Sequence, residues 1–487
     1  MEKALVDQYY GKDGEIVNDG ILCACILNQT DIKSNKNKFY IIQLIKTGND
    51  YNVFIRYGRI GERGVTRGYI CGNDMKSGVS WFAKEFKTKT GNIWSKNIYS
   101  TFQKKDKKYF LTQLDMTNID VPKLPQQQIT PSKLCDRIQN LIKLLSDVDM
   151  MSKAYVSLNL DPKKMPLGKI DKKQLDSAKE VLKKISESLN KKDDDSDSES
   201  EEEQQDLTEL SSQFYTYIPY SVGRRKPPVI SSNETIDKYM QLLDELEHMV
   251  VTASITNVDA KQDINKLDQI YDDLHATIEP LDKEDDMWKI INEYVKVAPT
   301  HNINIEIIDI YELKREGESK IYNKHNEKIG NKMLLWHGSG LTNWLSIIKN
   351  GYRLPHTLSG VVLTGWMFGA GTYFSNMFSK SFNYTRYSDF DNYACLSLSE
   401  VALGIQHEIT NAECDIDIDK ITKYGCHSTY GMGTTTVKPN HKISGVIIPA
   451  GEVYKRAVPS NLLYDEFIVY DTKQIKQKYI VIVKNKK

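Results

Sequence analysis

Two stretches near the N-terminus alternate apolar and polar side chains with the period of a β-strand. Residues 39–45 and 51–60 are separated by a Gly-Asn-Asp turn at residues 48–50, and this arrangement predicts a hairpin in a small antiparallel sheet. Residues 79–88 place aromatic side chains on one side of a predicted helix, and we expect Trp94 to pack beneath that helix.

The middle of the chain has the period of amphipathic helices. It begins with residues 119–131, which are rich in proline and glutamine, a composition typical of an extended linker between domains. Apolar residues then recur at helical spacing in three stretches, residues 138–145, 175–189 and 236–250. These stretches predict a helical bundle whose apolar stripes form its core.

The C-terminal part returns to short strand-like runs separated by glycine-containing and polar loops. These runs are residues 303–311, 334–336, 400–404, 442–449, 467–470 and 479–483. We therefore predict a multidomain α+β protein with a small antiparallel-sheet domain, an all-α bundle and a mostly antiparallel α+β domain. The predicted domains are residues 1–118, 132–297 and 298–487, with residues 119–131 as the linker.

The chain is neutral overall, but its charges are unevenly distributed. Residues 33–115 contain seventeen Lys and Arg against six Asp and Glu, a net charge of +11, whereas residues 193–203 contain eight acidic residues and three serines. Such an acidic stretch cannot bury enough apolar surface to fold, so we predict a disordered loop near residues 191–206. A solvated insertion is the simpler interpretation of this loop; the alternative is that it accepts a covalent modification.

Basic residues surround an aromatic residue on the predicted hairpin. Arg56, Arg59, Arg63 and Arg67 lie around Tyr57. Cations neutralise phosphates, and an aromatic ring can stack on a sugar or base at the end of a strand. The pattern suits nucleic-acid binding, although basic faces also bind membranes and acidic proteins.

Cysteine usage and apolar runs indicate where the protein works. The seven cysteines are scattered, with no C-x-x-C spacing, which is typical neither of a zinc module nor of a disulfide framework and favours a reducing compartment. No signal-peptide-like segment and no apolar run of membrane-spanning length occurs, so we expect an intracellular protein without a membrane partner. No G-x-G-x-x-G follows a predicted strand and opens a helix, so a Rossmann fold is not predicted.

Three motifs in the C-terminal part combine residues suited to holding a flat, polar ring. An apolar run ends in Trp336-His337-Gly338-Ser339, where a backbone can approach a ligand closely. Residues 367–384 supply glycines, aromatic rings, hydroxyls and a lysine, and residues 462–470 supply a pair of carboxylates. Together these motifs resemble the catalytic domain of the poly(ADP-ribose) polymerases, whose His, Tyr and Glu triad matches His337, Tyr373 and Glu466.

The resemblance implies a site that binds NAD+ as a substrate and holds no metal. The Gly338 backbone and the Ser381 hydroxyl would hold the nicotinamide carboxamide, with the ring between Tyr384 and Tyr373. The other implied NAD+-binding residues are His337 at a ribose hydroxyl, Ser339 and Arg353 toward the adenosine end, and Lys380. Glu466 would bind the ribose 2′-hydroxyl and help to deprotonate the incoming hydroxyl of a growing chain.

Two further segments resemble non-catalytic parts of the same family. Tyr57-Gly58-Arg59 stands where the family's WGR module has Trp-Gly-Arg, with Tyr57 in place of the Trp. The resemblance implies a DNA-binding domain over residues 1–118, with Arg56, Tyr57, Gly58 and Arg59 as contacts. Residues 165–170 resemble a turn of the family's helical regulatory domain. The resemblance then implies a regulatory role for residues 132–297 and for the carboxylate of Asp282.

As a whole, the resemblance implies a nuclear, DNA-break-activated poly(ADP-ribose) polymerase that acts in the response to DNA damage. Its implied partners are DNA strand breaks, protein acceptors including the enzyme itself, histones, and a partner protein that completes the acceptor site. Two alternatives stay open: a mono-ADP-ribosyltransferase on the same fold, and a non-catalytic DNA-end binding protein.

Overall fold

The computed structural model describes residues 6–112, 130–157, 170, 172–190, 201–256, 264–296, 304–354 and 367–486. Most of the predicted linker, the turn within residues 165–170 and residues 191–200 of the acidic stretch lie outside these ranges. The chain divides into two compact units, Met1–Pro125 with Ala154–Val250, and Gln126–Lys153 with Val251–Lys487. The domain boundaries inferred from the sequence stay a prediction.

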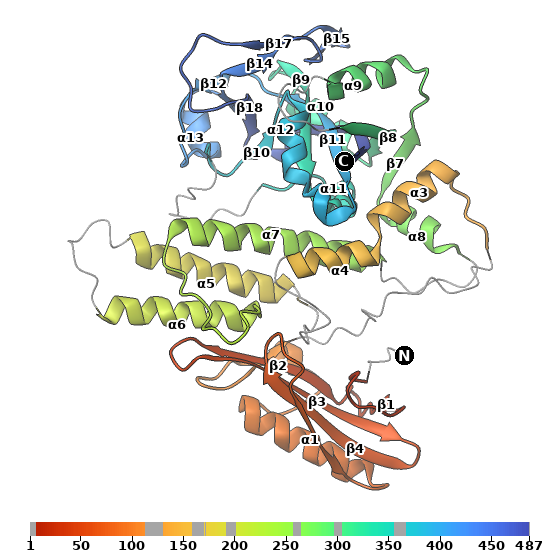
Figure 1. The fold of residues 1–487 in the computed structure, drawn as a ribbon, viewed down its shortest axis with the longest axis vertical. Helices are drawn as coiled ribbons and strands as arrows, with labels where there is room; N and C mark the ends of the chain where they lie inside the picture. The colour runs from red at the N-terminus through yellow and green to blue at the C-terminus, as the bar shows by residue number, and fades with distance from the viewer. Residues whose placement is uncertain are drawn as a thin grey trace. The chain divides into compact units, whose positions relative to one another are not determined.

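The first unit contains a six-stranded antiparallel sheet in the order β5-β4-β3-β2-β6, with β1 paired to β3. Its strands are β1 (Glu15–Ile16), β2 (Ala24–Asp31), β3 (Lys36–Thr47), β4 (Asp50–Arg59), β5 (Val65–Ile70) and β6 (Phe110–Thr112). The predicted hairpin is confirmed as β3 and β4. Helix α1 (Met75–Thr90) lies along one face of the sheet (Figure 1), and Trp94 packs edge-on against Phe82 and Phe86, as predicted.

The first unit also contains α2 (Ile98–Thr101), α5 (Lys172–Asn190), α6 (Glu201–Tyr217) and most of α7 (Asn233–Thr256). α6 lies against β2, where the Thr216 and Ser212 hydroxyls accept hydrogen bonds from the backbone N–H groups of Thr30 (3.1 Å) and Ile32 (3.0 Å). Because α6 begins at Glu201, residues 201–206, which we predicted to belong to a disordered loop, are helical. Acidic residues in a first turn favour helix formation because they complement the helix dipole.

The second unit begins with helix α3 (Asp136–Leu145) and also contains α8 (Lys266–Asp273) and α9 (Asp286–Lys296). α3 is anchored to the sheet of this unit, because Arg137 forms an ion pair with Asp309 and donates a hydrogen bond of 2.7 Å to the Leu281 carbonyl. The helical stretches predicted from periodicity therefore form helices, but they are shared between the two units.

A seven-stranded sheet in the order β15-β16-β9-β11-β19-β8-β7 forms the centre of the second unit. Its strands are β7 (Ala276–Pro280), β8 (Ile305–Arg315), β9 (Lys332–Ser339), β11 (Tyr393–Ala402), β15 (His441–Ile443), β16 (Val446–Ile448) and β19 (Ile475–Asn485). A second sheet has the order β10-β18-β13-β12, formed by β10 (Thr372–Phe374), β12 (Gln406–Ile409), β13 (Ser428–Gly431) and β18 (Glu466–Val469). Most pairs are antiparallel, as predicted.

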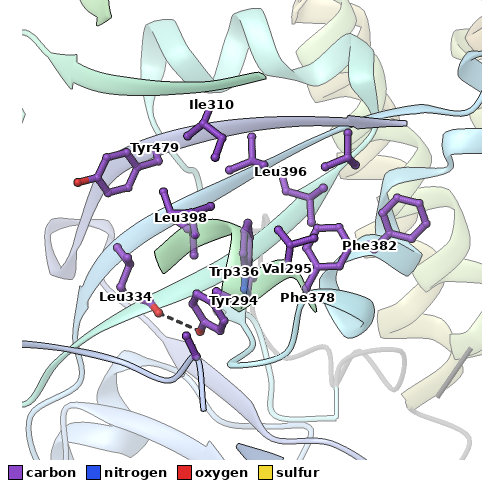
Figure 2. Packing of buried hydrophobic residues seen from close by; sticks show 14 of the residues in the cluster. Tyr294, Val295, Ile310, Leu334, Trp336, Phe378, Phe382, Leu396, Leu398 and Tyr479 are labelled. Carbon is purple, nitrogen blue, oxygen red and sulfur yellow. Dashed lines mark hydrogen bonds between the residues drawn. The ribbon is translucent and has the colours of Figure 1, made fainter. Parts of the chain in front are cut away.

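The main core of this unit lies between α9, α12 (Phe378–Phe382) and one face of the large sheet. Trp336 of β9 is fully buried there and packs edge-on against Phe378 at 5.3 Å, while the Tyr294 hydroxyl donates to the Leu334 carbonyl at 3.0 Å (Figure 2). This packing fixes the end of β9 and the short helix α12, which together carry several of the predicted site residues. No helix in the described ranges is long and apolar enough to cross a membrane.

Candidate active site

Neighbouring strands carry the three residues predicted to form the catalytic triad. His337 lies in β9, Tyr373 in β10 and Glu466 at the start of β18. β10 is hydrogen-bonded to β18, and two backbone hydrogen bonds of 2.8 and 3.0 Å between Trp336 and Ser375 join it to β9. The structure thus brings the three positions, which are far apart in the sequence, to one region of the fold.

The His337 imidazole is held in one tautomer by the backbone of Tyr373. Its Nδ1 lies 2.9 Å from the Tyr373 carbonyl oxygen, and because a carbonyl oxygen only accepts, Nδ1 carries the proton. Burial lowers the pKa of His337, and the hydrogen bond to Tyr373 offsets part of that effect. The neutral ring therefore presents Nε2 as a hydrogen-bond acceptor, which suits a ribose hydroxyl.

The Tyr373 hydroxyl anchors the glycine-containing loop that precedes β10. It accepts a hydrogen bond from Phe368 N (3.0 Å) and donates one to the Gly369 carbonyl (2.8 Å). Burial raises the pKa of Tyr373 well above its ordinary value, so the phenol stays neutral. Gly369 has φ +69°, and a Cβ there would lie 1.8 Å from the Ile416 carbonyl oxygen, so only glycine fits this turn.

The end of β9 runs very close to helix α12. A Cβ at Gly338 would lie 2.0 Å from the backbone oxygen of Ser381. The Ser381 hydroxyl is buried and donates to the Trp336 carbonyl at 3.1 Å. Gly338 and Ser381, the two groups predicted to hold a carboxamide, are therefore in direct proximity.

Glu466 forms an ion pair with Lys380 of α12. The Glu466 side chain is 9% exposed and that of Lys380 is 23% exposed. In surroundings with so little water, an ion pair orients its carboxylate more strongly than it would at the surface. The pair thus fixes a charged oxygen at the start of β18, beside the strand that carries Tyr373.

The remaining predicted NAD+-binding residues flank this region. The Ser339 hydroxyl accepts a hydrogen bond of 3.0 Å from the Asn343 amide. Tyr384 directly follows α12, and its side chain is 60% exposed, which leaves its ring accessible to a flat ligand. Arg353 is exposed and lies just before residues 355–366, which are outside the described ranges.

One residue of this region escaped the sequence analysis. Asp465, next to Glu466, is fully buried and accepts hydrogen bonds from side chains of several segments. A second charged residue, next to Glu466 in the otherwise apolar run of residues 462–470, was the available signal. Its partners are too distant in sequence to be recognised from the pattern.

Comparison with known proteins agrees with this arrangement. Three family models match: the WGR domain over residues 23–101, the poly(ADP-ribose) polymerase regulatory domain over residues 132–271, and the poly(ADP-ribose) polymerase catalytic domain over residues 285–485. Poly [ADP-ribose] polymerase 2 of Homo sapiens is 31% identical over 477 residues, which cover 94% of this chain and 79% of that protein. The chain belongs to the poly(ADP-ribose) polymerase family.

A second relative shows how much of a longer protein the chain spans. Poly [ADP-ribose] polymerase 1 of Gallus gallus is 36% identical over 479 residues, 96% of this chain but 45% of that protein. The chain thus spans less than half the length of this relative. The match nevertheless includes all three regions that the sequence analysis assigned to the family.

In the WGR domain of this family member, the four residues predicted to contact DNA have different surroundings. Tyr57 is 36% exposed and stacks on Tyr40 at 5.4 Å. Gly58 lies so close to Gly64 that a Cβ would come within 2.6 Å of its Cα. Of the four, Tyr57 is the one whose side chain is both aromatic and accessible.

The two arginines of this set are engaged by the protein itself. Arg56 is 5% exposed and forms an ion pair of 2.8 Å with Asp7. Arg59 donates to the carbonyl oxygens of Asn35, Gly223 and Arg225. Their proposed contact with DNA stays a prediction, and in this structure Arg59 connects the sheet to the segment that follows α6.

Asp282, predicted to be a regulatory carboxylate, lies on the surface before α9. It is exposed, and its Oδ1 accepts a hydrogen bond of 3.1 Å from Glu284 N within the same turn. The structure thus gives it a local role in the turn before α9. Its regulatory role stays a prediction.

Proposed function

We propose that this protein is a poly(ADP-ribose) polymerase activated by DNA strand breaks. It would bind NAD+ as a substrate, break the bond between the nicotinamide nitrogen and ribose C1′, and release nicotinamide with the bonding electron pair. An acceptor oxygen would then bond to C1′ and lose its proton. Such reactions pass through a state with positive charge on the ribose, which a nearby carboxylate stabilises.

The observation that carries this proposal is the nearly buried Glu466 carboxylate, ion-paired with Lys380 beside the strands of His337 and Tyr373. In this role Glu466 would bind the ribose 2′-hydroxyl and help to remove the proton of the incoming hydroxyl. The neutral His337, with Nε2 as an acceptor, would bind a ribose hydroxyl. Hydrogen bonds from the ribose hydroxyls to His337 and Glu466 would therefore orient the ribose of NAD+ beside the Glu466 carboxylate.

The nicotinamide ring would be held by the remaining residues of the region. An amide needs one donor and one acceptor, and the Gly338 backbone with the nearby Ser381 hydroxyl supplies both kinds of group. The Tyr384 ring is accessible for stacking, and Tyr373 would form the opposite wall. Ser339, Arg353 and Lys380 would bind the rest of the dinucleotide.

DNA breaks would bind the WGR domain at Tyr57, whose ring is exposed on a sheet surrounded by basic residues. Arg59, at the end of β4, donates to the carbonyl oxygens of residues 223 and 225. A movement of Arg59 on DNA binding would therefore shift the segment that follows α6. We propose this route for activation, with Asp282 as a regulatory carboxylate. The protein would act in the nucleus on protein acceptors, histones and itself, with a partner protein completing the acceptor site.

A mono-ADP-ribosyltransferase is the second candidate, since the same site could transfer a single unit. Incubation with labelled NAD+, with and without nicked DNA, separates the two on a denaturing gel. We expect a DNA-stimulated smear of long products from the wild type, whereas single-unit transfer would give a discrete band shift. No incorporation at all would favour a non-catalytic DNA-end binding protein.

Matched variants then test the assigned residues. Glu466→Gln is expected to abolish chain growth, because an amide cannot take up a proton as a carboxylate does. Glu452→Gln, at a side chain that is 87% exposed, serves as the control and should behave like the wild type. Polymer of normal length from Glu466→Gln would contradict the role of Glu466, and DNA stimulation unchanged by Tyr57→Ala would contradict the role of Tyr57.

A further inference from the structure

The Asp465 carboxylate is a fully buried charge for which the proposed reaction has no use. Its side chain is 0% exposed, and it directly precedes Glu466. A buried carboxylate is costly unless its oxygens are fully hydrogen-bonded. Both oxygens of Asp465 meet this condition. Its Oδ1 accepts from Gly433 N (2.9 Å) and Arg456 Nη1 (2.6 Å). Its Oδ2 accepts from Tyr430 Oη (2.9 Å), Asn376 Nδ2 (3.1 Å), Arg456 Nη2 (3.2 Å) and Thr436 Oγ1.

These donors come from separate segments of the second unit. Tyr430 belongs to β13, Thr436 to β14 (Thr435–Val437), and Arg456 directly follows β17 (Val453–Lys455). Asn376 follows β10, and its neighbour Ser375 donates through Oγ to the Asp465 carbonyl at 3.1 Å. The Asp465 side chain thus connects the start of β18 to several separate segments.

A second contact reaches the residue on the other side of Glu466. The Tyr430 ring stacks on Phe467 at 4.8 Å with an interplanar angle of 9°. Arg456 donates to the Tyr430 hydroxyl and lies 5.6 Å from the centre of its ring. The Arg456–Tyr430 pair therefore contacts both neighbours of Glu466, Asp465 through hydrogen bonds and Phe467 through ring stacking.

Alternation along a strand separates these contacts from the reacting side. Side chains of successive residues in β18 point to opposite faces, so Glu466 and Phe467 lie on opposite faces of the strand. Asp465 directly precedes the strand and contacts Tyr430, the residue that stacks on Phe467. The Glu466 carboxylate meets Lys380. Arg456 and Tyr430 thus hold the two neighbours of Glu466, while Lys380 holds the Glu466 carboxylate itself.

We propose that Asp465, with Arg456 and Tyr430, is a positioning residue that fixes Glu466 for the chain-growth step. This inference rests on the proposed role of Glu466. A displacement of about 1 Å in a reacting group can cost on the order of a hundredfold in rate. Loss of the contacts of Asp465 with Arg456 and Tyr430 would therefore slow catalysis even if the fold persisted. A purely structural role for Asp465 would instead lower stability and leave the rate per folded molecule unchanged.

The test compares Asp465→Asn with the wild type in labelled-NAD+ assays of chain growth, with melting temperature and benzamide affinity measured in parallel. Asparagine keeps the shape but removes the charge that Arg456 faces. We expect kcat for elongation to fall about tenfold, while KM for NAD+ and the affinity for benzamide, a probe of the nicotinamide pocket, change less than about twofold. Tyr430→Phe, which removes one donor and keeps the ring, should give a smaller loss of the same kind.

A double variant separates positioning from independent effects. If Asp465 acts through Glu466, then adding Asp465→Asn to Glu466→Gln lowers the residual rate of nicotinamide release no further. A multiplicative loss in the double variant, or an unchanged kcat in both Asp465→Asn and Tyr430→Phe, would overturn the inference. Wild-type protein that forms no polymer with nicked DNA would instead overturn the proposed function, so the two failures are distinguishable.

Discussion

The Lys380 ammonium group pairs with the Glu466 carboxylate, joining α12 to β18 across 86 residues of sequence. α12 is held by Phe378 and Phe382, which are buried in the core. The hydrophobic core therefore fixes α12, a helix of five residues, and α12 in turn fixes the Glu466 carboxylate through Lys380.

Loss of this ion pair should damage catalysis more than binding. In Lys380→Met the Glu466 carboxylate keeps its burial but loses its partner, so its orientation loosens, and we expect elongation to fall by roughly ten- to a hundredfold. Lys380→Arg keeps the cation and should retain more activity. Steady-state kinetics with NAD+ measure both variants; equal losses in the two would show that the charge is not what matters.

The state of His337 predicts how the reaction depends on pH. Because burial lowers its pKa below the ordinary value of about 6.5, the ring stays neutral at pH 7 and is protonated only in more acidic solution. Nε2 then becomes a donor, so kcat/KM should be flat from pH 8 to about 6.5 and fall below that range.

Stability should follow the same direction. The unfolded chain binds the proton of His337 at a higher pH than the folded chain does, so the free energy of unfolding falls as pH drops through this window. NMR titration of the imidazole locates the transition directly. A midpoint above pH 7 would contradict both expectations.

Two neighbouring glycines provide a matched pair of variants. Gly338→Ala would place a Cβ 2.0 Å from the Ser381 backbone oxygen, so β9 and α12 must separate, and we expect a loss of about 1–3 kcal/mol in stability together with loss of benzamide binding. Gly340→Ala meets no atom closer than 3.7 Å and has φ −55°, which alanine adopts readily. Calorimetry and a binding titration compare them; equal behaviour would mean that the close approach is not required.

The N-terminal sheet offers a test of a buried ion pair. Asp7 and Arg56 have side chains only 5% and 6% exposed, so Asp7→Ala leaves an unpaired buried charge and should destabilise the first unit by about 3–5 kcal/mol. Asp106→Ala removes a pair whose side chains are more than four-fifths exposed and should cost almost nothing. Denaturant unfolding followed by tryptophan fluorescence gives both values, and a small loss in Asp7→Ala would refute the expected cost.

Much of the fold could be predicted because its periodicities are local. The strand period of residues 39–60 and the helical stripes of residues 138–145 report burial on one face, and both elements form where expected. The convergence of His337, Tyr373 and Glu466 followed from motifs whose order was informative. Their mutual geometry needed the structure.

What escaped prediction depends on partners that are distant in sequence. The pairing of Arg56 with Asp7, 49 residues away, left no local signal in the sequence. Asp465 stands out in the sequence as a charged residue in an apolar run, but its hydrogen bond with Tyr430 joins residues 35 positions apart and could not be predicted. Side-chain networks of this kind carry no periodic signal, so only coordinates reveal them.

The contact of α6 with β2 has a practical consequence for work with fragments. Within the described residues, β6 pairs with β2 over residues 26–28, and beyond them the backbone amides of Thr30 and Ile32 donate to hydroxyls of residues 216 and 212. A fragment that ends near residue 118 would leave the N–H groups of Thr30 and Ile32 without these acceptors. Unpaired N–H groups along a strand can pair with another molecule. Expression of the DNA-binding part alone would therefore be better served by keeping α6 attached.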